Sequence, residues 1–318
     1  MKLLYMTDPG NVDPWHRDFV ASLGDEWEVV MWSAERPFAA QVEGALAVVD
    51  VGARLEPGMV RQAGEAGVKL WQLIFTGYDQ LDLGLFRANG IPVANTPGQF
   101  SARALAELAL MLMLCTVRGF TRAQRDLHVG LVSHSFGGEL AGRTLGLIGL
   151  GASGRELAKL TMPLGLDVIG INPAGSSANQ AADLGVDVLG GPDKLDELLG
   201  RSDVMSIHVP LTPATRQMIG ADALSKMKPD SILINVARGQ IVDQPALVDA
   251  LRAGRIAGAG LDVFAVEPLP ADDPLLSLDN VVLTPHVAGA TYETSRRRGV
   301  AAAENVRRVA RGEAPLYV

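Results

Sequence analysis

One glycine-rich turn, set between a strand-like run and a helix-like run, constrains this chain most. The apolar run Leu145–Ile148 suits a buried parallel strand, and Arg155–Leu160 has the composition of a helix. The turn between them carries three glycines in the pattern G-x-G-x-x-G, at Gly149, Gly151 and Gly154. In a strand–turn–helix context this pattern predicts a βαβ unit that binds a dinucleotide. The alternative is a glycine-rich turn without a ligand.

Each glycine of this turn has a physical task. The first permits the tight turn, the second lets the backbone approach a pyrophosphate, and the third lets the helix pack closely on the strand. Free N–H groups and the helix dipole then favour negative charge at the helix start. We therefore predict that this turn binds a cofactor through five residues, namely Gly149, Gly151, Ala152, Ser153 and Gly154.

The composition favours a globular protein of two domains. The chain has 318 residues, of which 48% are hydrophobic and 20% charged. The formal charge of −8 argues against a nucleic-acid partner, which would require a basic face. A single cysteine, Cys115, allows no intrachain disulfide and fits a reducing cytoplasm. No signal peptide is visible, and the apolar run 104–117 is too short to span a bilayer. We expect a cytoplasmic protein with no membrane partner and no metal.

Strand-like and helix-like runs alternate along the chain, which predicts an α/β fold with parallel sheets. Five strands are expected before residue 100, at Lys2–Met6, Glu28–Trp32, Ala45–Val51, Lys69–Ile74 and Pro92–Ala94. After the strand at residue 144, six more are expected, at Asp167–Ile171, Val186–Leu189, Val204–Ile207, Ser231–Asn235, Ala257–Asp262 and Val281–Leu283.

Two long helices define the expected domain boundaries. The first, Ser101–Gly119, has little polar surface and is expected to be buried between domains or subunits. The last, from about 291 to 311, is expected to pack back on the first domain, with its basic run Arg296–Arg298 facing solvent. We therefore predict one domain from 1–100 plus about 291–318, and a second, Rossmann-like domain from 101–290.

Ligands of such sheets bind beyond the carboxyl ends of the strands. Residues at these ends of the second sheet are therefore candidates for contact with the cofactor or substrate, namely Asn172, His208, Pro210, Val236, Ala237, Arg238, Asp262 and His286. Arg238 and His286 stand at two of these ends, and Glu267 follows a third. Together they supply an arginine, an acid and a histidine. Reduction of a 2-oxo acid needs a proton donor, for which histidine is suited near neutral pH. It also needs a fork-shaped partner for the carboxylate, which arginine supplies. Composition and periodicity alone do not bring the three together.

Several sequence blocks, in order, resemble the D-isomer-specific 2-hydroxyacid dehydrogenases. This family includes D-3-phosphoglycerate dehydrogenase, glyoxylate/hydroxypyruvate reductase and D-lactate dehydrogenase. The blocks are GRTLGLIGLG (142–151), HVPLTPAT (208–215), MKPDSILINVARG (227–239), AGAGLDVF (257–264), EPLP (267–270) and NVVLTPHVAG (280–289). The resemblance implies hydride transfer between a nicotinamide and a D-2-hydroxy or 2-oxo acid.

The resemblance also assigns roles to residues. It implies that Arg238 binds the substrate carboxylate, that Glu267 pairs with His286, and that His286 donates the proton in reduction. Backbone N–H groups of Thr76 and Gly77 would meet the carboxylate. Asp262 and Gly289 would lie at the cofactor site, the former near the nicotinamide. The family further implies two Rossmann-like or flavodoxin-like domains, a cleft between them that closes on the ligand, and a homodimer built on the helix after residue 100.

The sequence departs from the family pattern at the ribose site. Members that prefer NAD usually carry an acid about where Asn172 stands. An asparagine can bond a ribose hydroxyl but does not repel a 2′-phosphate, and Ser176 and Ser177 could attract one. NAD and NADP both remain open, and we favour NAD. No regulatory domain follows residue 318, so we expect no feedback control through one.

Two other functions are compatible with this fold. A cofactor-sensing co-repressor of the same fold would keep the same three residues, but no peptide-docking signal accompanies them. A formate dehydrogenase would pair the histidine with glutamine, whereas residue 267 is glutamate.

Overall fold

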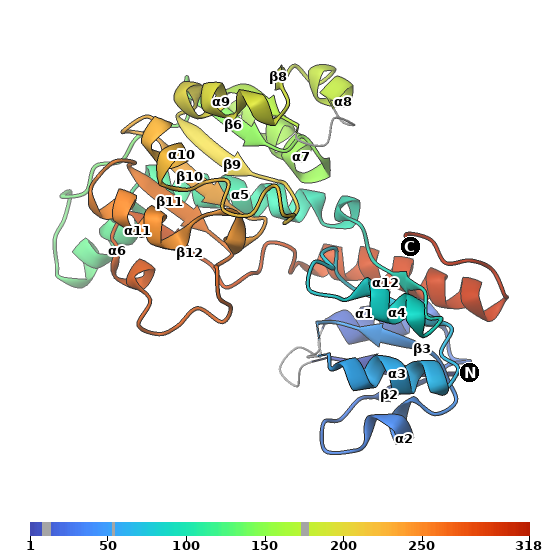
Figure 1. Ribbon diagram of the computed structural model, residues 1–318. Coiled ribbons are helices and arrows are strands. Elements are labelled where there is room, and N and C mark those ends of the chain that lie inside the picture. The colour runs from blue at the N-terminus through green and yellow to red at the C-terminus, as the bar shows by residue number, and fades with distance from the viewer. Residues whose placement is uncertain (8–13, 53–54, 173–177) are drawn as a thin grey trace. The chain divides into compact units, whose positions relative to one another are not determined.

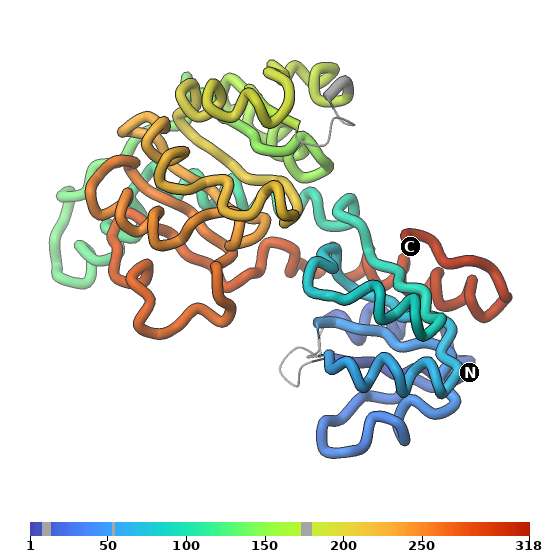
Figure 2. Tube along the Cα trace, viewed as in Figure 1, coloured from blue at the N-terminus to red at the C-terminus, as the bar shows by residue number. Residues whose placement is uncertain are grey.

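The chain forms two compact units, each built on its own parallel sheet. The structure, a computed structural model, describes residues 1–7, 14–52, 55–172 and 178–318 (Figure 1). Unit 1 contains residues 1–100 and 290–318, and unit 2 contains residues 101–289. The chain passes between the units twice, after Phe100 and after Gly289 (Figure 2). The predicted α/β class with parallel sheets is confirmed.

The sheet of unit 1 has five parallel strands in the order β2-β1-β3-β4-β5, which is the flavodoxin-like order. The strands are β1 (Lys2–Met6), β2 (Glu28–Met31), β3 (Ala45–Asp50), β4 (Leu70–Leu73) and β5 (Val93–Ala94). Side chains of β1 alternate between the faces. Leu3 and Tyr5 enter one core, whereas Leu4 and Met6 enter the other. The sheet is therefore covered on both faces.

Helices from both ends of the chain cover the sheet of unit 1. They are α1 (Trp15–Leu23), α2 (Phe38–Val42), α3 (Pro57–Glu65), α4 (Leu83–Ala88) and the C-terminal α12 (Tyr292–Ala310). Helix α12 packs on α1 so closely that a Cβ at Gly299 would lie 2.9 Å from the backbone of Asp18. Ala302 and Val306 enter the same core as Phe19. The return of the last helix to the first sheet explains why unit 1 is discontinuous.

One prediction for α12 is wrong. The run Arg296–Arg298 was expected to face solvent as a whole. Arg296 and Arg297 are exposed, but Arg298 is only 7% exposed. The first and third of three consecutive residues lie about 200° apart around a helix, so the three cannot share the centre of one face. Here Arg298 is the one that is buried.

The sheet of unit 2 has seven parallel strands in the order β12-β11-β10-β9-β6-β7-β8. The strands are β6 (Thr144–Ile148), β7 (Asp167–Ile171), β8 (Asp187–Gly190), β9 (Val204–Ile207), β10 (Ile232–Asn235), β11 (Gly258–Leu261) and β12 (Val281–Leu283). The first strand of this unit, β6, is central, with β7 on one side and β9 on the other. This arrangement is the Rossmann order with one further strand, and the strand order reverses between β6 and β9.

The helices of unit 2 cover both faces of its sheet. They are α5 (Ala102–Val117), α6 (Phe120–His128), α7 (Ala152–Thr161), α8 (Ala178–Ala182), α9 (Leu195–Arg201), α10 (Ala221–Lys226) and α11 (Gln244–Arg252). Helices α5 and α7 share one core with β6, and α9 to α11 share the other with β7 and β9. Helix α5 packs closely on β11. A Cβ at Gly260 would lie only 2.8 Å from Leu112, so the absence of a side chain there permits this packing.

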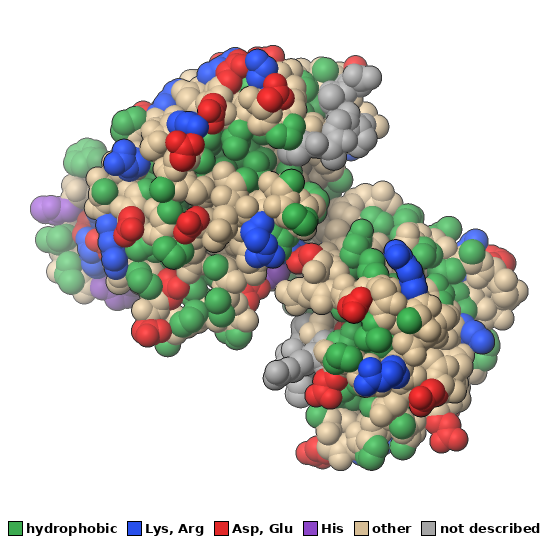
Figure 3. Space-filling model, in the orientation of Figure 1, with side chains coloured by type: hydrophobic (Ala, Val, Ile, Leu, Met, Phe, Trp, Pro, Cys, Tyr) green, Lys and Arg blue, Asp and Glu red, His purple; other side chains and the backbone are tan. Residues whose placement is uncertain are grey.

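The surface mixes both signs of charge. On the face shown in Figure 3, acidic and basic side chains intermingle over each unit. Among the described residues, no single helix is long and apolar enough to cross a membrane, although α5 and α6 reach that composition as a pair bent by 57°. Within the same ranges, no group of three or more His, Cys, Asp or Glu side chains could hold a metal ion.

Candidate active site

The glycine-rich turn lies at the reversal of strand order in unit 2, between β6 and α7. Gly149 has a φ of +103°, and a Cβ there would lie 2.6 Å from the carbonyl oxygen of His208. A Cβ at Gly154 would lie 2.2 Å from the oxygen of Gly149, so only glycine allows α7 to start this close to β6. By contrast, a Cβ at Gly151 would meet nothing within 4 Å among the described residues. The open side of this turn thus leaves room for a ligand.

A histidine from the neighbouring strand braces this turn. His208 follows β9, and its Nδ1 lies 3.1 Å from the hydroxyl of Ser153 in the first turn of α7. Its Nε2 lies 2.9 Å from the hydroxyl of Ser206. Burial lowers the pKa of His208 to about 4, so the ring is neutral at physiological pH. A neutral ring donates at one nitrogen and accepts at the other, which fixes the Ser153 hydroxyl beside the helix N-terminus.

The predicted ribose contact is also placed to receive a ligand. Asn172 follows β7 and is 9% exposed. Its backbone N–H donates to Gly190, but its side-chain Nδ2 has no hydrogen-bond partner among the described residues. A buried amide donor without an acceptor is costly unless a ligand supplies one. The turn and Asn172 therefore fit a dinucleotide. Ser176 and Ser177 lie outside the described residues.

The other predicted cofactor residues occupy strand ends of the same sheet. Pro210 is exposed, and its oxygen accepts from Thr215. Val236 is buried, and the N–H of Ala237 donates to the side chain of Asn235. Gly289 is the last residue of unit 2.

Asp262 directly follows β11, and its side chain is fully buried. Its carboxylate has no exposed surface, and three donors from the loop after β12 occupy it. One oxygen accepts from the Thr284 hydroxyl at 2.7 Å and from the Val287 N–H at 2.9 Å, and the other accepts from the Ala288 N–H at 2.8 Å. Burial raises the pKa of Asp262 despite these hydrogen bonds. In this structure, Asp262 shapes the loop that carries His286.

His286 sits at the centre of that loop in a left-handed backbone conformation, with φ at +55°. This conformation is unfavourable for a residue with a side chain. It is held by the His286 N–H, which donates to the carbonyl oxygen of Asp262 at 2.8 Å. Asp262 thus holds the His286 loop in two ways. Its backbone carbonyl accepts from the His286 N–H, and its carboxylate accepts from the residues that flank His286.

The structure brings the predicted acid and histidine together. Nδ1 of His286 lies 2.7 Å from Oε2 of Glu267, nineteen residues away in the chain. Nε2 of His286 has no hydrogen-bond partner among the described residues, and the side chain is 47% exposed. The pair therefore presents one anchored nitrogen and one open nitrogen, as proton transfer to a bound substrate requires.

Glu267 is ionised at neutral pH. Burial alone would raise the pKa of its carboxyl, but hydrogen bonds from His286 and from the Phe264 N–H outweigh burial and lower that pKa. The charge of Arg238 lowers the same pKa, and the residue after Arg238 packs against the backbone of Phe264, three residues before Glu267. Arg238, Glu267 and His286 therefore form one cluster at the carboxyl edge of the sheet.

The loops that carry Arg238 and Glu267 are packed backbone against backbone. A Cβ at Gly239 would lie 1.9 Å from the carbonyl carbon of Phe264, so the residue after Arg238 must be glycine. Asn235 completes the Arg238 turn, because its side chain donates to the Arg238 oxygen at 2.9 Å and accepts from Ala237. From the start of α11, Gln244 accepts from the Ala265 N–H at 2.9 Å.

Sequence reasoning missed these supporting residues. Asn235 lies within a quoted block, yet nothing in its spacing showed that its side chain closes the Arg238 turn. The one available signal for Asn235 was a polar residue at the end of an otherwise apolar strand. Gln244 and Ser206 carried no signal, because their partners lie on other elements.

The predicted substrate loop belongs to unit 1. Thr76 and Gly77 follow β4 and are half-buried. The Thr76 hydroxyl donates to the oxygen of Thr96 at 3.0 Å, and the Thr76 oxygen accepts from Asn95 at 2.8 Å. Among the described residues, neither the Thr76 N–H nor the Gly77 N–H donates a hydrogen bond. Two free amides are a suitable partner for a carboxylate.

Residues 110–288 match the family model described as "D-isomer specific 2-hydroxyacid dehydrogenase, NAD binding domain". The match covers more than half of the chain. The chain belongs to the D-isomer-specific 2-hydroxyacid dehydrogenase family. The resemblance read from the sequence blocks is thereby confirmed.

Named relatives of the family extend the comparison. Hydroxypyruvate reductase of Thermotoga maritima is 43% identical over 235 residues, which cover 72% of this chain and 74% of the relative. D-3-phosphoglycerate dehydrogenase of Methanocaldococcus jannaschii is 36% identical over 312 residues, or 95% of this chain but 57% of the relative. The chain thus spans little more than half of that longer relative. A solved structure of an acyclic imino acid reductase (Bsp5), in complex with NADPH and D-Arg, is similar with a TM-score of 0.83 at 29% identity, over 100% of this chain and 99% of that one.

A pH profile tests the Glu267–His286 pair of this family member. Glu267→Gln keeps the shape of the side chain but removes the negative charge beside the imidazole. The ring then lacks the anion that pairs with its charged form. We therefore expect the high-pH limb of the reduction rate to move to lower pH. The matched control is Glu313→Gln, an exposed glutamate of unit 1. A limb that stays in place in both variants would contradict the pairing.

Proposed function

We propose that this protein is an NAD(P)-dependent oxidoreductase that converts small 2-oxo acids and D-2-hydroxy acids into each other, with reduction as the favoured direction. One observation carries the proposal. His286 presents an open Nε2 while its Nδ1 lies 2.7 Å from Glu267, and Arg238 lies beside this pair. A proton donor, its anionic support and a carboxylate-binding arginine are the groups that this reaction requires.

The roles follow from the chemistry of each side chain. When bound, a nicotinamide supplies the hydride that reduces the carbonyl carbon. Arg238 binds the substrate carboxylate through its guanidinium fork and orients the carbonyl group. His286 gives the proton on Nε2 to the carbonyl oxygen, and Glu267 stabilises the charged ring before that transfer. In the oxidative direction the neutral Nε2 takes the proton back.

The cofactor would be held by the residues of unit 2 that have open polar groups. The start of α7 offers N–H groups without intrahelical acceptors, beside the open side of Gly151. The Ser153 hydroxyl, held by His208, adds a further polar group there. Asn172 offers its Nδ2 to a ribose hydroxyl. We favour NAD over NADP, and both fit the neutral side chain of Asn172.

An acid at position 172 tests that contact. Asn172→Asp adds a negative charge that accepts from ribose hydroxyls and repels a 2′-phosphate. We expect the ratio of kcat/KM for NADH to that for NADPH to rise by about tenfold or more, measured on one 2-oxo acid. Asn89→Asp, a substitution in unit 1, controls for the change in net charge. An unaltered ratio would show that residue 172 does not meet the ribose.

We further propose that two copies associate through unit 2. Apolar side chains are exposed along α5, α6 and the segment after α6, namely Met111, Leu114, Phe120, Leu127, Val129, Leu131, Val132 and Phe136. Phe136 is 84% exposed and Val132 81%. An apolar surface of this kind marks an interface, and a second copy of the chain would cover it. Sedimentation velocity should give the mass of a dimer; a monomer at micromolar concentration would contradict this proposal.

Turnover tests the function itself. The loss of reduced-nicotinamide absorbance is followed with NADH and with NADPH, each against glyoxylate, hydroxypyruvate, pyruvate, phenylpyruvate and 2-oxoglutarate. Clear turnover of one acid supports the proposal. Tight binding of a cofactor without turnover of any acid would favour the co-repressor function instead.

A further inference from the structure

A buried arginine lies directly behind the loop that carries Thr76 and Gly77. Arg298 of α12 is 7% exposed, and its Nη2 donates to the Thr76 hydroxyl at 3.1 Å. Its Nη1 points at the oxygen of Ile74, 3.5 Å away. The guanidinium of Arg298 on α12 thus contacts the Thr76 loop, which lies more than 200 residues earlier in the chain.

The position of Arg298 is itself fixed. Its guanidinium carbon lies 5.7 Å from the centre of the Trp15 ring, within the range of a cation–π contact. Seven residues further along α12, on the same face, Asn305 donates to the buried Gln72 of β4 at 2.8 Å. Helix α12 is therefore fastened to β4 and to the loop that follows it. Burial and the nearby charge of Arg297 lower the pKa of Arg298 to about 10, so the guanidinium stays charged at neutral pH.

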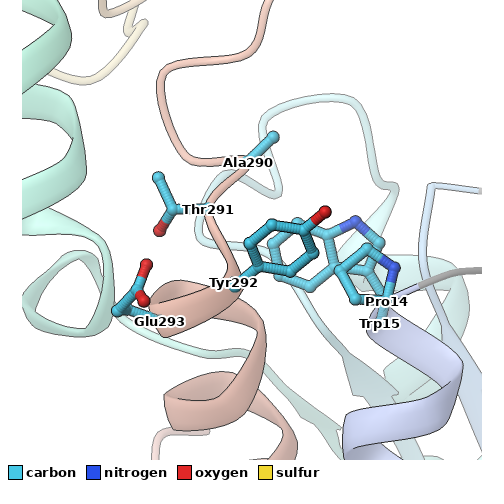
Figure 4. A pocket seen from close by; sticks show the side chains of 6 residues that line it. All are labelled: Pro14, Trp15, Ala290, Thr291, Tyr292 and Glu293. Atoms are coloured by element: carbon cyan, nitrogen blue, oxygen red, sulfur yellow. The ribbon is translucent and has the colours of Figure 1, made fainter.

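The Trp15 ring, which faces the Arg298 guanidinium, also lines a pocket. Trp15 lines a pocket of about 470 Å³ together with Pro14 and the first residues of α12 (Figure 4). Tyr292 also lines this pocket. Arg298 itself does not line this pocket. Two of its polar contacts go to the segment after β4, at Ile74 and Thr76.

Thr76 is held on three sides. Its hydroxyl donates to Thr96 and accepts from Arg298, and its carbonyl oxygen accepts from Asn95. Neither the Thr76 N–H nor the Gly77 N–H donates a hydrogen bond among the described residues. A loop whose amides are held in place before the ligand arrives loses less entropy when it binds.

We propose that Arg298 is a positioning residue for substrate binding, which acts through the Thr76 hydroxyl to hold the Thr76 and Gly77 amides for the carboxylate of a 2-oxo acid. This inference rests on the proposed function, because it assigns the carboxylate to these two amides. It adds a residue that does not itself touch the substrate. The contact with Thr76 predicts an effect on substrate affinity and not on the chemical step.

The test separates affinity from turnover. Arg298→Met keeps the length and the apolar stem but removes the donors. We expect it to raise KM for the 2-oxo acid by about tenfold, while kcat and the Kd of the reduced cofactor change by less than about twofold. Thr76→Val removes the acceptor and should raise KM to a similar degree. Thr76→Ser keeps the hydroxyl, so its KM should lie closer to that of the wild type. Arg296→Met, an exposed arginine on the same helix, is the matched control.

A merely structural role would give a different pattern. Arg298→Met would then lower the melting temperature and leave KM unchanged in the folded fraction, which would overturn the proposal. Equal KM values for Thr76→Val and Thr76→Ser would also overturn it.

Hydrogen exchange tests the contact independently of turnover. The Thr96 N–H donates to Phe75 at 3.2 Å and reports on the Thr76 loop. Exchange of segment 94–97 should be faster in Arg298→Met than in Arg296→Met. If the wild type reduces no 2-oxo acid, the proposed function is wrong, whatever the exchange experiment shows. If exchange of segment 94–97 is the same in Arg298→Met and Arg296→Met, the proposed positioning contact is wrong.

Discussion

Replacing His286 by alanine is expected to lower kcat for reduction of a 2-oxo acid by about 10² to 10⁴-fold, the usual contribution of a positioned proton donor. The open Nε2 of His286 is the group proposed to give its proton to the carbonyl oxygen. Glu267 keeps the hydrogen bond from the Phe264 N–H and the nearby charge of Arg238, which both favour its ionised form, so it is a poor proton donor at neutral pH.

The cofactor should still bind to this variant. The glycine-rich turn and Asn172 do not depend on the His286 ring, so the Kd of NADH should change by less than about twofold, measured by quenching of protein fluorescence. His128→Ala, an exposed histidine on α6, is the control for loss of an imidazole. Turnover of His286→Ala at the level of the control would rule out the proposed proton donor.

The second large effect is expected at Arg238. Arg238→Gln removes both the charge and the fork that would bind the substrate carboxylate. Each charge-assisted hydrogen bond of this kind contributes about 1.5–3 kcal/mol. We therefore expect kcat/KM to fall by about 10³-fold or more.

Arg238→Lys separates the two contributions. It keeps the charge but loses the planar pair of donors, so its kcat/KM should lie between those of the wild type and Arg238→Gln. Arg216→Gln, an exposed arginine of the same unit, serves as the control for a change in net charge. If Arg238→Gln matches Arg216→Gln, the substrate carboxylate is bound elsewhere.

Elements that depend on local pattern were predictable from the sequence. The bounds expected for β1, β7, β9 and β12 agree with the structure, because an apolar run of the right length and a turn signal define each of them. The order of the strands did not follow from these runs. It depends on pairings between segments distant in the chain, such as that of β6 with β9.

Polar short helices were harder to predict. The polar segment 122–139 carries no motif that indicates an element, yet α6 begins at Phe120 and ends at His128. None of its residues is buried, and its few apolar side chains, such as Phe120 and Leu127, are exposed. Its identity depends on its contacts with α5 and β12 instead.

The candidate site was predictable in its residue types but not in its support. Strand-end reasoning and the family resemblance indicated Arg238, Glu267 and His286, and the structure places them in one cluster. Their roles stay predictions until they are measured. The side chains that hold them act across elements, as Asp262 does for the His286 loop. The burial of Arg298 depends on the packing of α12 against β4, which the run of three arginines does not reveal.

The most direct test of the account is the product itself. Wild-type protein is incubated with reduced nicotinamide and the 2-oxo acid that gives the highest turnover, and the hydroxy acid is resolved by chiral chromatography. We predict one D-2-hydroxy acid for each reduced nicotinamide consumed, with an acid other than glyoxylate because glycolate is achiral, and at least about 10²-fold less product from His286→Ala in the same time. Formation of the L-isomer would contradict the account, and so would cofactor that binds tightly but is not consumed with any 2-oxo acid.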